Sequence, residues 1–322
     1  RGTGMTTIRL ENLVKRFDLG RGFFGGVHGR VHAVENVSFD LQPGETLSLV
    51  GESGCGKSTT ARAVLRLLEP DSGDVRIDGI DMRSLGPKEL RRFRRKAQIV
   101  FQDPSAALNP RRTAFQAVAE GLLTHGMVSR DALRARVIEL FSMVGLSEEH
   151  LDRHPHAFSG GQRQRIGIAR ALAVEPKLLV LDEPVSALDV SVQAQVVNLL
   201  EDIQERTGVG YLFIAHDMGV VRHVSHHIAV MYLGRIVEEG PAEEVCAAPL
   251  HPYTRSLIAS VPSLGGASAE AIAVGEMPSP LNPPSGCAFH PRCPLAKPEC
   301  SRSRPELVAA GPNRQVACPF AV

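Results

Sequence analysis

The sequence lacks three features that would place it in a specialised class of protein: a surplus of one charge, a long apolar run and a dense set of cysteines. Its 322 residues include 36 Lys and Arg against 35 Asp and Glu, which leaves a formal net charge of +1. Non-specific nucleic-acid binding needs a clustered positive surplus, so this balance gives it no support. The longest apolar stretches, such as residues 178–181, are far shorter than the roughly 20 residues that span a bilayer. Six cysteines are too few for a disulfide scaffold, and with no export signal visible we expect reduced thiols in a cytosolic chain.

The composition divides the chain into two parts. With 43% hydrophobic and 22% charged residues the chain can bury a sizeable core, and its length is that of about two domains. Of the 22 prolines, 14 lie from Pro241 onward, together with five of the six cysteines. Residues before that point alternate between strand and helix patterns. We therefore predict one domain over residues 6–240 and a loop-rich second domain over residues 241–322 with little core of its own.

The first part has the pattern of an α/β fold. Short apolar runs bounded by turn residues predict buried strands at 46–50, 97–102, 178–182 and 211–215. Apolar residues at helical spacing predict helices between them, such as 58–68 and 191–206. This alternation predicts a mainly parallel sheet covered by helices. Residues 103–174 have a helical pattern throughout and are predicted to form a helical subdomain inserted into the α/β core.

Residues 51–58, Gly-Glu-Ser-Gly-Cys-Gly-Lys-Ser, match the phosphate-loop pattern G-x-x-x-x-G-K-[ST]. They follow a predicted strand and precede a predicted helix, which is the context that this pattern requires. Gly51, Gly54 and Gly56 let backbone N–H groups turn inward around an anion at a helix start. Lys57 places a charge on the β- and γ-phosphates, and the Ser58 hydroxyl can ligate Mg²⁺. A glycine-rich turn with an incidental lysine is the alternative.

Two acidic residues, Asp182 and Glu183, stand at the end of a predicted buried strand. Sheet ends present ligand-handling side chains in folds of this class. Asp182 can complete the Mg²⁺ shell, and Glu183 can orient and deprotonate an attacking water. An N-cap pair for the following helix is the alternative.

Between these motifs lies Ser159-Gly160-Gly161-Gln162, which leads into the predicted helix 165–174. A Ser-Gly-Gly sequence at a helix start is a second potential phosphate cradle. Because the chain holds one full phosphate loop, a second cradle suggests a nucleotide shared between two chains. The same sequence is also an ordinary helix cap.

Along the chain the motifs follow in this order: the phosphate loop, Gln102, Ser159–Gln162, Asp182-Glu183, Ser186–Asp189 and His216. This order resembles that of the ATP-binding cassette (ABC) family, over residues 6–240. The resemblance implies an α/β P-loop NTPase of the ABC type, with a mixed sheet core and an inserted helical subdomain. It also implies a head-to-tail dimer that binds two ATP molecules, each held by the phosphate loop of one chain and the signature Ser159–Gln162 of the other. The implied nucleotide contacts are Phe17, Gly51, Ser53, Gly54, Cys55, Gly56, Lys57, Ser58 and Thr59. The implied Mg²⁺ ligands are Ser58, Gln102 and Asp182.

Three further residues gain a role from the resemblance. Gln102 resembles the Q-loop residue, which senses the γ-phosphate and Mg²⁺ and contacts the membrane partner. His216 resembles the switch histidine that grips the γ-phosphate, although a histidine after a strand is otherwise structural. Asp189 resembles the loop acid that communicates across the dimer. The implied catalytic set is Glu183, His216, Gln102 and Lys57.

An aromatic residue that stacks on adenine is expected near the start of the chain. Phe17 stands at the expected place, while Phe23 and Phe24 compete for the same role in a glycine-rich insertion. A plain core residue is the alternative reading of Phe17.

Several stretches resemble the oligopeptide/dipeptide importer ATPases: residues 51–59, 101–104, 108–111, 186–195, 251–257 and 286–294. Of the two ATPase types in this subfamily, residues 101–104 and 108–111 resemble the F-type subunit. The resemblance implies an ATPase that powers import of short peptides from the cytoplasmic face of the membrane. Implied partners are a second homologous ATPase, two permeases and an external peptide-binding protein. An importer of nickel or another small chelate and a soluble ABC ATPase without a transport role are the alternatives.

The C-terminal part carries Cys287, Cys293, Cys300 and Cys318. Four thiolates can hold tetrahedral zinc or an iron–sulfur cluster. Zinc sites usually contain C-x₂₋₄-C pairs, and this spacing has none. The resemblance to the importer subfamily implies a [4Fe–4S] cluster with a structural role, while zinc and free or disulfide-linked thiols stay open.

Overall fold

The computed structural model describes residues 6–21, 27–260 and 275–321. They form two compact units, each built from separate stretches of the sequence. The first unit comprises Leu41–Glu45 and Ile77–Ile214 with residues 6–7. The second comprises the described residues of Ile8–Asp40, Thr46–Arg76 and Ala215–Val322.

The first unit is built around a parallel sheet. Strand β7 (Leu178–Asp182) pairs with β6 (Ala97–Val100) on one side and β8 (Gly210–Ala215) on the other, both in parallel. All residues of β7 and β8 are buried, which explains their continuous apolar sequence. The predictions of 178–182 and 211–215 are confirmed to within one residue. The predicted strand 97–102 ends two residues early, so that Gln102 lies in the loop after β6.

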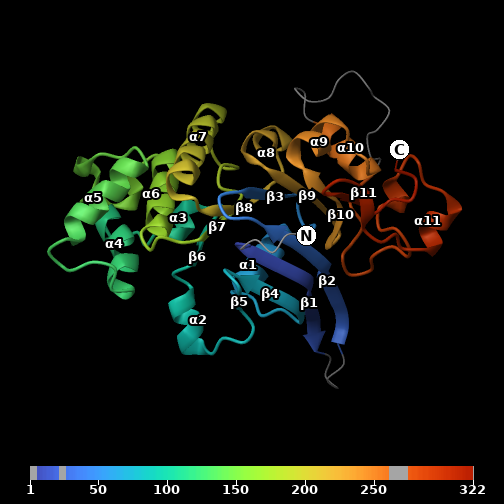
Figure 1. Cartoon of the computed structure of the whole chain (residues 1–322), viewed down its shortest axis with the longest axis horizontal. Coiled ribbons are helices and arrows are strands. Elements are labelled where there is room, and N and C mark those ends of the chain that lie inside the picture. Colours follow the sequence, from blue (N-terminus) through green and yellow to red (C-terminus); the bar gives the residue numbers. More distant parts are fainter. Residues whose placement is uncertain (1–5, 22–26, 261–274, 322) are drawn as a thin grey trace. The chain divides into compact units, whose positions relative to one another are not determined.

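The inserted residues 103–174 are helical, as predicted. They form α3 (Pro104–Ala107), α4 (Ala114–Thr124), α5 (Leu133–Met143) and α6 (Gly160–Leu172), with short 3₁₀ turns at Glu148–His150 and Pro155–Ala157. Helices α3, α4 and α5 each pack on α6 (Figure 1). The predicted helix 165–174 was placed too late, because α6 already begins at Gly160.

Other helices of the first unit follow the predicted pattern. Helix α7 (Val190–Thr207) confirms the prediction of 191–206 and packs on α6, while α2 (Pro87–Phe93) precedes β6. The two-residue strand β5 (Ile80–Asp81) comes before α2.

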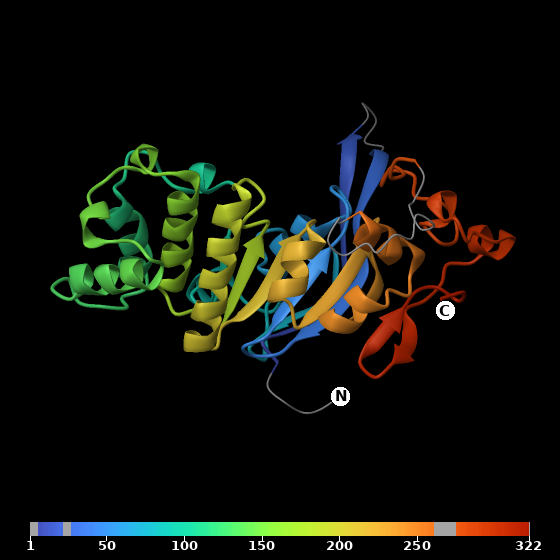
Figure 2. The same cartoon turned by 90° about the horizontal axis from the view of Figure 1, so that it is seen from above.

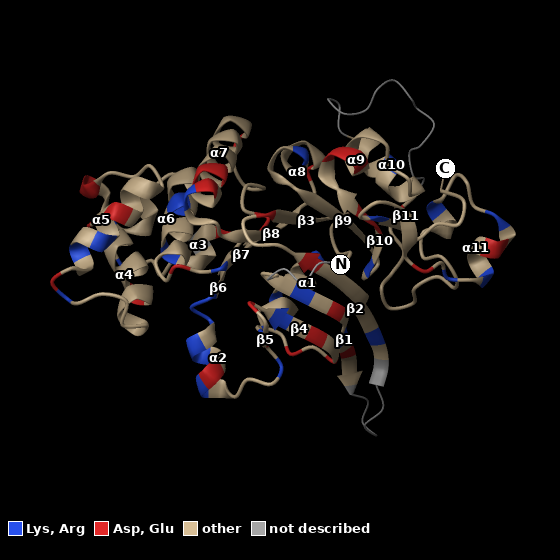
Figure 3. Ribbon diagram, viewed as in Figure 1, with Lys and Arg blue, Asp and Glu red and all other residues tan. Residues whose placement is uncertain are grey.

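The second unit contains two groups of strands. In the first group, β3 (Thr46–Val50) and β9 (His227–Tyr232) pair in parallel, and β10 (Arg235–Pro241), β12 (Arg314–Val316) and β11 (Val308–Gly311) follow in antiparallel order. In the second group, β1 (Ile8–Arg21) lies between β2 (Val27–Leu41) and β4 (Ser72–Ile77). Charges of both signs lie along β1, β2 and β4 (Figure 3) and form the pairs Arg9–Asp40, Lys15–Asp71 and Arg30–Asp18.

Helices of the second unit are short. They are α1 (Lys57–Val64), α8 (Met218–Val224), α9 (Ala242–Ala247), α10 (Pro252–Ala259) and α11 (Pro298–Arg302). Helix α1 contacts β1, α8 contacts β3, and α9 contacts β9 and β10; Figure 2 shows α9 and α10 beside the strand β10 that precedes them. Helix α1 ends at Val64, four residues before the predicted end. Across the described residues, no helix is both long and apolar enough to cross a membrane.

The C-terminal region has a core, which the sequence pattern did not predict. Its Tyr253 and Phe289 are almost fully buried and contact Tyr232 at the end of β9, with ring centroids 4.7 and 5.3 Å from the Tyr232 ring. Strand β10 contributes Glu238 to this core; it is 0% exposed and accepts a hydrogen bond of 2.6 Å from Arg314. The tail therefore builds its core jointly with strands that precede it in the sequence.

Candidate functional site

The phosphate loop connects β3 to α1 in the second unit. Gly51 and Gly56 both have a positive φ, of 151° and 112°. A Cβ atom on Gly51 would collide with the carbonyl oxygen of Met231, and one on Gly56 with that of Ala33. The loop therefore needs glycine at both positions, because β9 and β2 approach its backbone directly.

Lys57 lies inside this loop rather than in solvent. Its Nζ atom donates to the carbonyl oxygens of Gly51 at 2.7 Å and Glu52 at 3.0 Å, and the residue is 5% exposed. Cys55 is buried beneath the loop, and burial raises the pKa of its thiol although the nearby Lys57 opposes this. The ammonium group is thus held by carbonyl oxygens of the loop itself, next to the loop N–H groups that could bind an anion.

Four other predicted nucleotide contacts lie around the same loop. Ser53 and Gly54 are exposed at its tip, and Ser58 and Thr59 are half-buried in the first turn of α1. An anion seated in the loop would meet the N-terminal end of α1, where unpaired N–H groups and the helix dipole favour negative charge.

The paired acids lie at the end of β7 in the first unit. Asp182 is buried there, and Glu183 adopts a left-handed backbone conformation with φ 50° while its N–H donates to the Ile214 carbonyl. Gln102 comes from the loop after β6, and its Nε2 atom donates to Glu183 at 2.9 Å and to Ser186 at 3.3 Å. Two predicted catalytic residues, Gln102 and Glu183, are therefore in direct contact, and a left-handed non-glycine residue is common at functional sites.

The signature residues form the start of α6. Ser159 is the N-cap: its Oγ accepts from the Gln162 N–H at 3.3 Å, while Gln162 Oε1 accepts from the Ser159 N–H at 3.0 Å. A Cβ atom on Gly161 would collide with Val192 of α7. The Ser-Gly-Gly sequence is thus a true helix start with an exposed cap, and its glycine lets α6 and α7 pack closely.

Asp189 and His216 both precede helices. Asp189 is the exposed N-cap residue of α7 in the first unit, next to Val190, which is 82% exposed. His216 is an exposed residue after β8, and Asp217 beside it caps α8 by accepting from the Gly219 N–H at 2.7 Å.

Phe17 lies on β1 and is 36% exposed, with Lys15 Nζ 5.4 Å from its ring centroid. It is therefore not a core residue. Phe23 and Phe24 lie outside the described residues.

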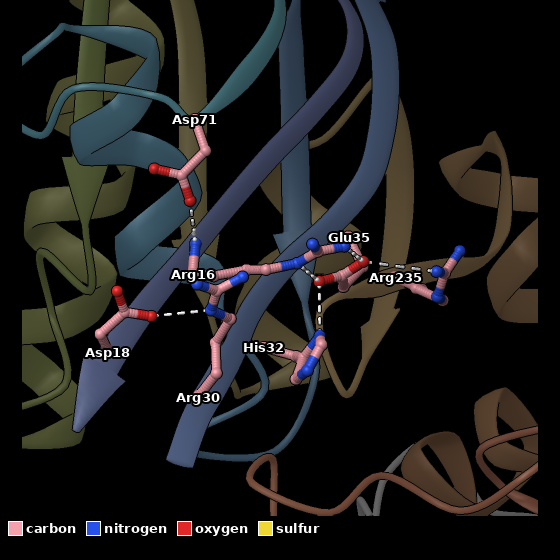
Figure 4. Close-up of polar contacts among 7 residues, drawn as sticks. All are labelled: Arg16, Asp18, Arg30, His32, Glu35, Asp71 and Arg235. Atoms are coloured by element: carbon pink, nitrogen blue, oxygen red, sulfur yellow. Dashed lines mark hydrogen bonds and ion pairs between the residues drawn. The ribbon is translucent and has the colours of Figure 1, made fainter. Parts of the chain in front are cut away.

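A charged cluster around Glu35 was not foreseen from the sequence (Figure 4). Glu35 of β2 is 8% exposed and accepts hydrogen bonds from Arg16 at 2.5 and 2.8 Å, and lies 2.7 Å from His32 Nδ1. Arg235 of β10 approaches the same carboxylate at 3.6 Å. Burial alone would raise the pKa of Glu35, but the hydrogen bonds from Arg16 and His32 outweigh it and lower that pKa. The cluster therefore links β1, β2 and β10 through one buried carboxylate.

All four C-terminal cysteines line one pocket of the second unit, together with His251 and Phe289. None of the four forms a disulfide. Burial raises the pKa of Cys287, Cys293 and Cys318. In the described part of the chain, no group of three or more His, Cys, Asp or Glu side chains is arranged to hold a metal ion. The four thiols share one pocket.

Known proteins resemble this chain in sequence. Residues 34–186 match the family described as ABC transporter, and residues 237–300 match the description "Oligopeptide/dipeptide transporter, C-terminal region". A "Probable peptide ABC transporter ATP-binding protein y4tS" of Sinorhizobium fredii is 52% identical over 97% of this chain and 89% of its own length. The "Oligopeptide transport ATP-binding protein AppF" of Bacillus subtilis is 49% identical over 97% of both chains.

Solved structures of ABC cassettes share the fold. The dimeric post-hydrolysis state of the ATP-binding cassette MJ0796, bound to ADP and Pi, has a TM-score of 0.65 at 32% identity and covers 73% of this chain and 98% of its own. The cbiO1 protein of Clostridium perfringens has a TM-score of 0.66 at 28% identity, covering 81% of this chain and 97% of its own. A likeness of this extent in sequence and in fold shows that the chain belongs to the ABC transporter ATPases that carry an oligopeptide/dipeptide transporter C-terminal region.

Proposed function

We propose that this chain hydrolyses ATP to ADP and phosphate in order to power a membrane importer of di- or oligopeptides. The observation that carries the proposal is that, in one chain, residues 34–186 match the ABC transporter family and residues 237–300 match the oligopeptide/dipeptide transporter C-terminal region. The relatives named above are peptide and oligopeptide transport ATP-binding proteins, which supports the same substrate class.

ATP would be bound by the phosphate loop of one subunit and the signature Ser159–Gln162 of another. Lys57 would neutralise charge on the β- and γ-phosphates, and Ser159 with Gly160 and Gly161 would offer N–H groups from the second subunit. Because each γ-phosphate would attract a signature loop from the opposite chain, ATP would favour the closed dimer. Hydrolysis removes that attraction and the dimer reopens.

Glu183 would act on the attacking water. Its carboxylate accepts a hydrogen bond from Gln102, which would orient it and couple it to the γ-phosphate side of the site. Ser58, Gln102 and Asp182 would hold Mg²⁺, which supplies charge neutralisation at the phosphates. His216 would donate to the γ-phosphate, Asp189 would contact the opposite subunit, and Phe17 would stack on adenine.

The transport role implies partners. We propose a second homologous ATPase as the other half of the dimer, two permeases and an external peptide-binding protein, with this chain at the cytoplasmic face of the membrane. Residues 6–240 would form the nucleotide-binding domain with residues 103–174 as its helical part, and residues 241–322 the importer-type extension.

We propose further that Cys287, Cys293, Cys300 and Cys318 hold a [4Fe–4S] cluster. The support is that all four cysteines line one pocket and that their spacing lacks the C-x₂₋₄-C pairs usual in zinc sites. The test is anaerobic purification followed by visible absorption and metal analysis. One zinc and no iron per chain would overturn the cluster.

The transport proposal is tested on membranes. Affinity purification of the tagged chain from gently solubilised membranes should recover two permeases and a second ATPase, and the purified complex in vesicles should accumulate a labelled dipeptide only with ATP and the binding protein. The matched control is Glu183→Gln, which should assemble the same complex and transport nothing. Recovery of a freely soluble ATPase without permeases would refute the transport role, and uptake of a nickel chelate in place of peptide would refute the substrate class.

A further inference from the structure

The C-terminal region touches the phosphate loop at Glu52, a residue that none of the motif roles uses. All of these contacts lie within the second unit. The backbone N–H of Glu52 donates to the hydroxyl of Tyr253, at the start of α10, at 2.8 Å. The Glu52 carboxylate accepts from Arg292 Nη1 with both oxygens, at 3.0 Å each.

Every polar group of Glu52 is therefore committed. Besides its N–H group and its carboxylate, the third polar group of Glu52 is its carbonyl oxygen, which accepts a hydrogen bond from Lys57 Nζ at 3.0 Å. Two of the three commitments come from the C-terminal region, more than 200 residues away in the sequence. Because Glu52 is the second residue of the loop, these contacts fix the loop backbone at the point where Lys57 also anchors.

Arg292 is well prepared for this contact. Its side chain is 9% exposed, and its guanidinium lies 5.9 Å from the ring centroid of Tyr232 and 6.0 Å from that of Phe289. Many surface ion pairs contribute little, because ordering two long side chains costs entropy. Here the guanidinium is already held against two buried rings, so much less freedom is lost when it binds the carboxylate.

The charge of Glu52 gives the contact a consequence for nucleotide binding. A carboxylate on a loop that binds phosphates repels an anionic ligand unless it is neutralised. Arg292 supplies that neutralisation. Met277 also lies next to the loop: its Cε is 3.4 Å from the position that a Cβ atom on Gly54 would occupy.

We propose that Arg292 and Tyr253 of the C-terminal region are positioning residues of the ATP site: they hold Glu52, neutralise its charge and so set the affinity of the phosphate loop for nucleotide. The proposal rests on the proposed use of the loop for ATP. It makes the extension part of the nucleotide site rather than a separate attachment.

The test is calorimetric titration of the full-length, anaerobically purified chain with Mg-ATP and with Mg-ADP. Binding by the unmodified chain tests the function of the loop by itself. We expect Arg292→Met to weaken ATP binding about tenfold, within the usual range of coupling between sites. Adding Glu52→Gln to this variant removes the unneutralised charge and should restore affinity to within about threefold of the unmodified chain. Arg302→Met, which replaces an exposed arginine of α11, is the matched control and should bind as the unmodified chain does.

The rescue distinguishes positioning from a general loss of fold, since a damaged fold would not be repaired by a change in the loop. Unchanged ATP binding by a folded Arg292→Met overturns the proposal, and so does weakened binding that Glu52→Gln does not restore. If Arg292→Met does not fold, Tyr253→Phe is tested in its place, because it removes only the hydroxyl group. This variant should weaken ATP binding about threefold or more. Unchanged ATP affinity of a folded Tyr253→Phe would refute the proposal.

Discussion

Removing Arg314 should strongly destabilise the second unit. Arg314 of β12 is buried and donates to Glu238 of β10, which is 0% exposed. Besides this ion pair, the Glu238 carboxylate accepts from the N–H groups of Leu250 at 3.0 Å and His251 at 2.8 Å. Arg314→Met preserves most of the side-chain volume but leaves a buried carboxylate without a cation.

The expected cost follows from that burial. Breaking a buried ion pair by removing one partner costs about 3–5 kcal/mol, because the remaining charge is desolvated and unpaired. That is a large part of the roughly 5–15 kcal/mol of a typical domain. Glu238→Gln in the same background removes the charge and keeps an acceptor for the two N–H groups. The double variant should therefore recover at least about half of the loss, since replacing both partners is often close to neutral.

The assay is equilibrium unfolding in urea followed by tyrosine emission. The sequence contains 3 tyrosines and no tryptophan, and Tyr232 and Tyr253 both lie in the aromatic cluster next to Glu238. Arg302→Met is the control and should change the unfolding free energy by less than about 0.5 kcal/mol. A loss below about 1 kcal/mol in Arg314→Met would refute the reasoning, because an unpaired buried carboxylate cannot cost so little.

Three further predictions concern the two units. Glu183→Gln should bind ATP but hydrolyse it about 10²–10⁴ times more slowly. The rate of phosphate release is measured on the assembled complex and on the isolated chain. An unchanged rate would exclude Glu183 as the base. Glu35 has a pKa below its ordinary value of 4.5, so its stabilisation is present above that value and disappears as the pH falls through the lower pKa of the folded state. The stability difference between the unmodified chain and Glu35→Gln should therefore shrink on acidification in urea unfolding, and a difference that grows instead would contradict the sign. Gly161→Ala should destabilise the first unit by about 1–3 kcal/mol, because the added methyl collides with Val192; thermal melting checks this against Gly167→Ala in the same helix, whose Cβ would meet nothing within 4 Å.

Continuous apolar runs made β3, β7 and β8 predictable from the sequence, although the largely buried strand β9 was missed. Residues 46–50 and 178–182 are buried throughout. A strand buried on both faces has a continuous apolar sequence, which can be recognised without knowing its neighbours. The ends of elements were less predictable: helix α6 begins at Gly160 because Ser159 and Gln162 cap it, and glycine-rich starts look like loops in a propensity pattern. Strands β1 and β2 were missed because they mix charged and apolar residues, and their ion pairs form only in the folded sheet.

The motif residues could be listed from the sequence, but the contacts that hold them could not. The hydrogen bond between Gln102 and Glu183 joins residues 81 positions apart, and the contact of Arg292 with Glu52 joins residues 240 apart. No local pattern encodes such pairs. The aromatic core of the C-terminal region escaped prediction for the same reason, since Tyr232 belongs to β9 and only the fold brings it to Tyr253 and Phe289.

The pairing of β3 with β9 has a consequence for synthesis of the chain. Leu47 of β3 pairs with His227 of β9. About 180 further residues must therefore be synthesised after β3 before its neighbour β9 leaves the ribosome. Arg292 follows later still. At roughly 5–20 residues per second, a nascent chain spends on the order of 10–50 s with Glu52 exposed and β3 lacking β9. The helical residues 103–174 can pack on one another during that interval, whereas the phosphate loop acquires its final shape only after Arg292 has left the ribosome.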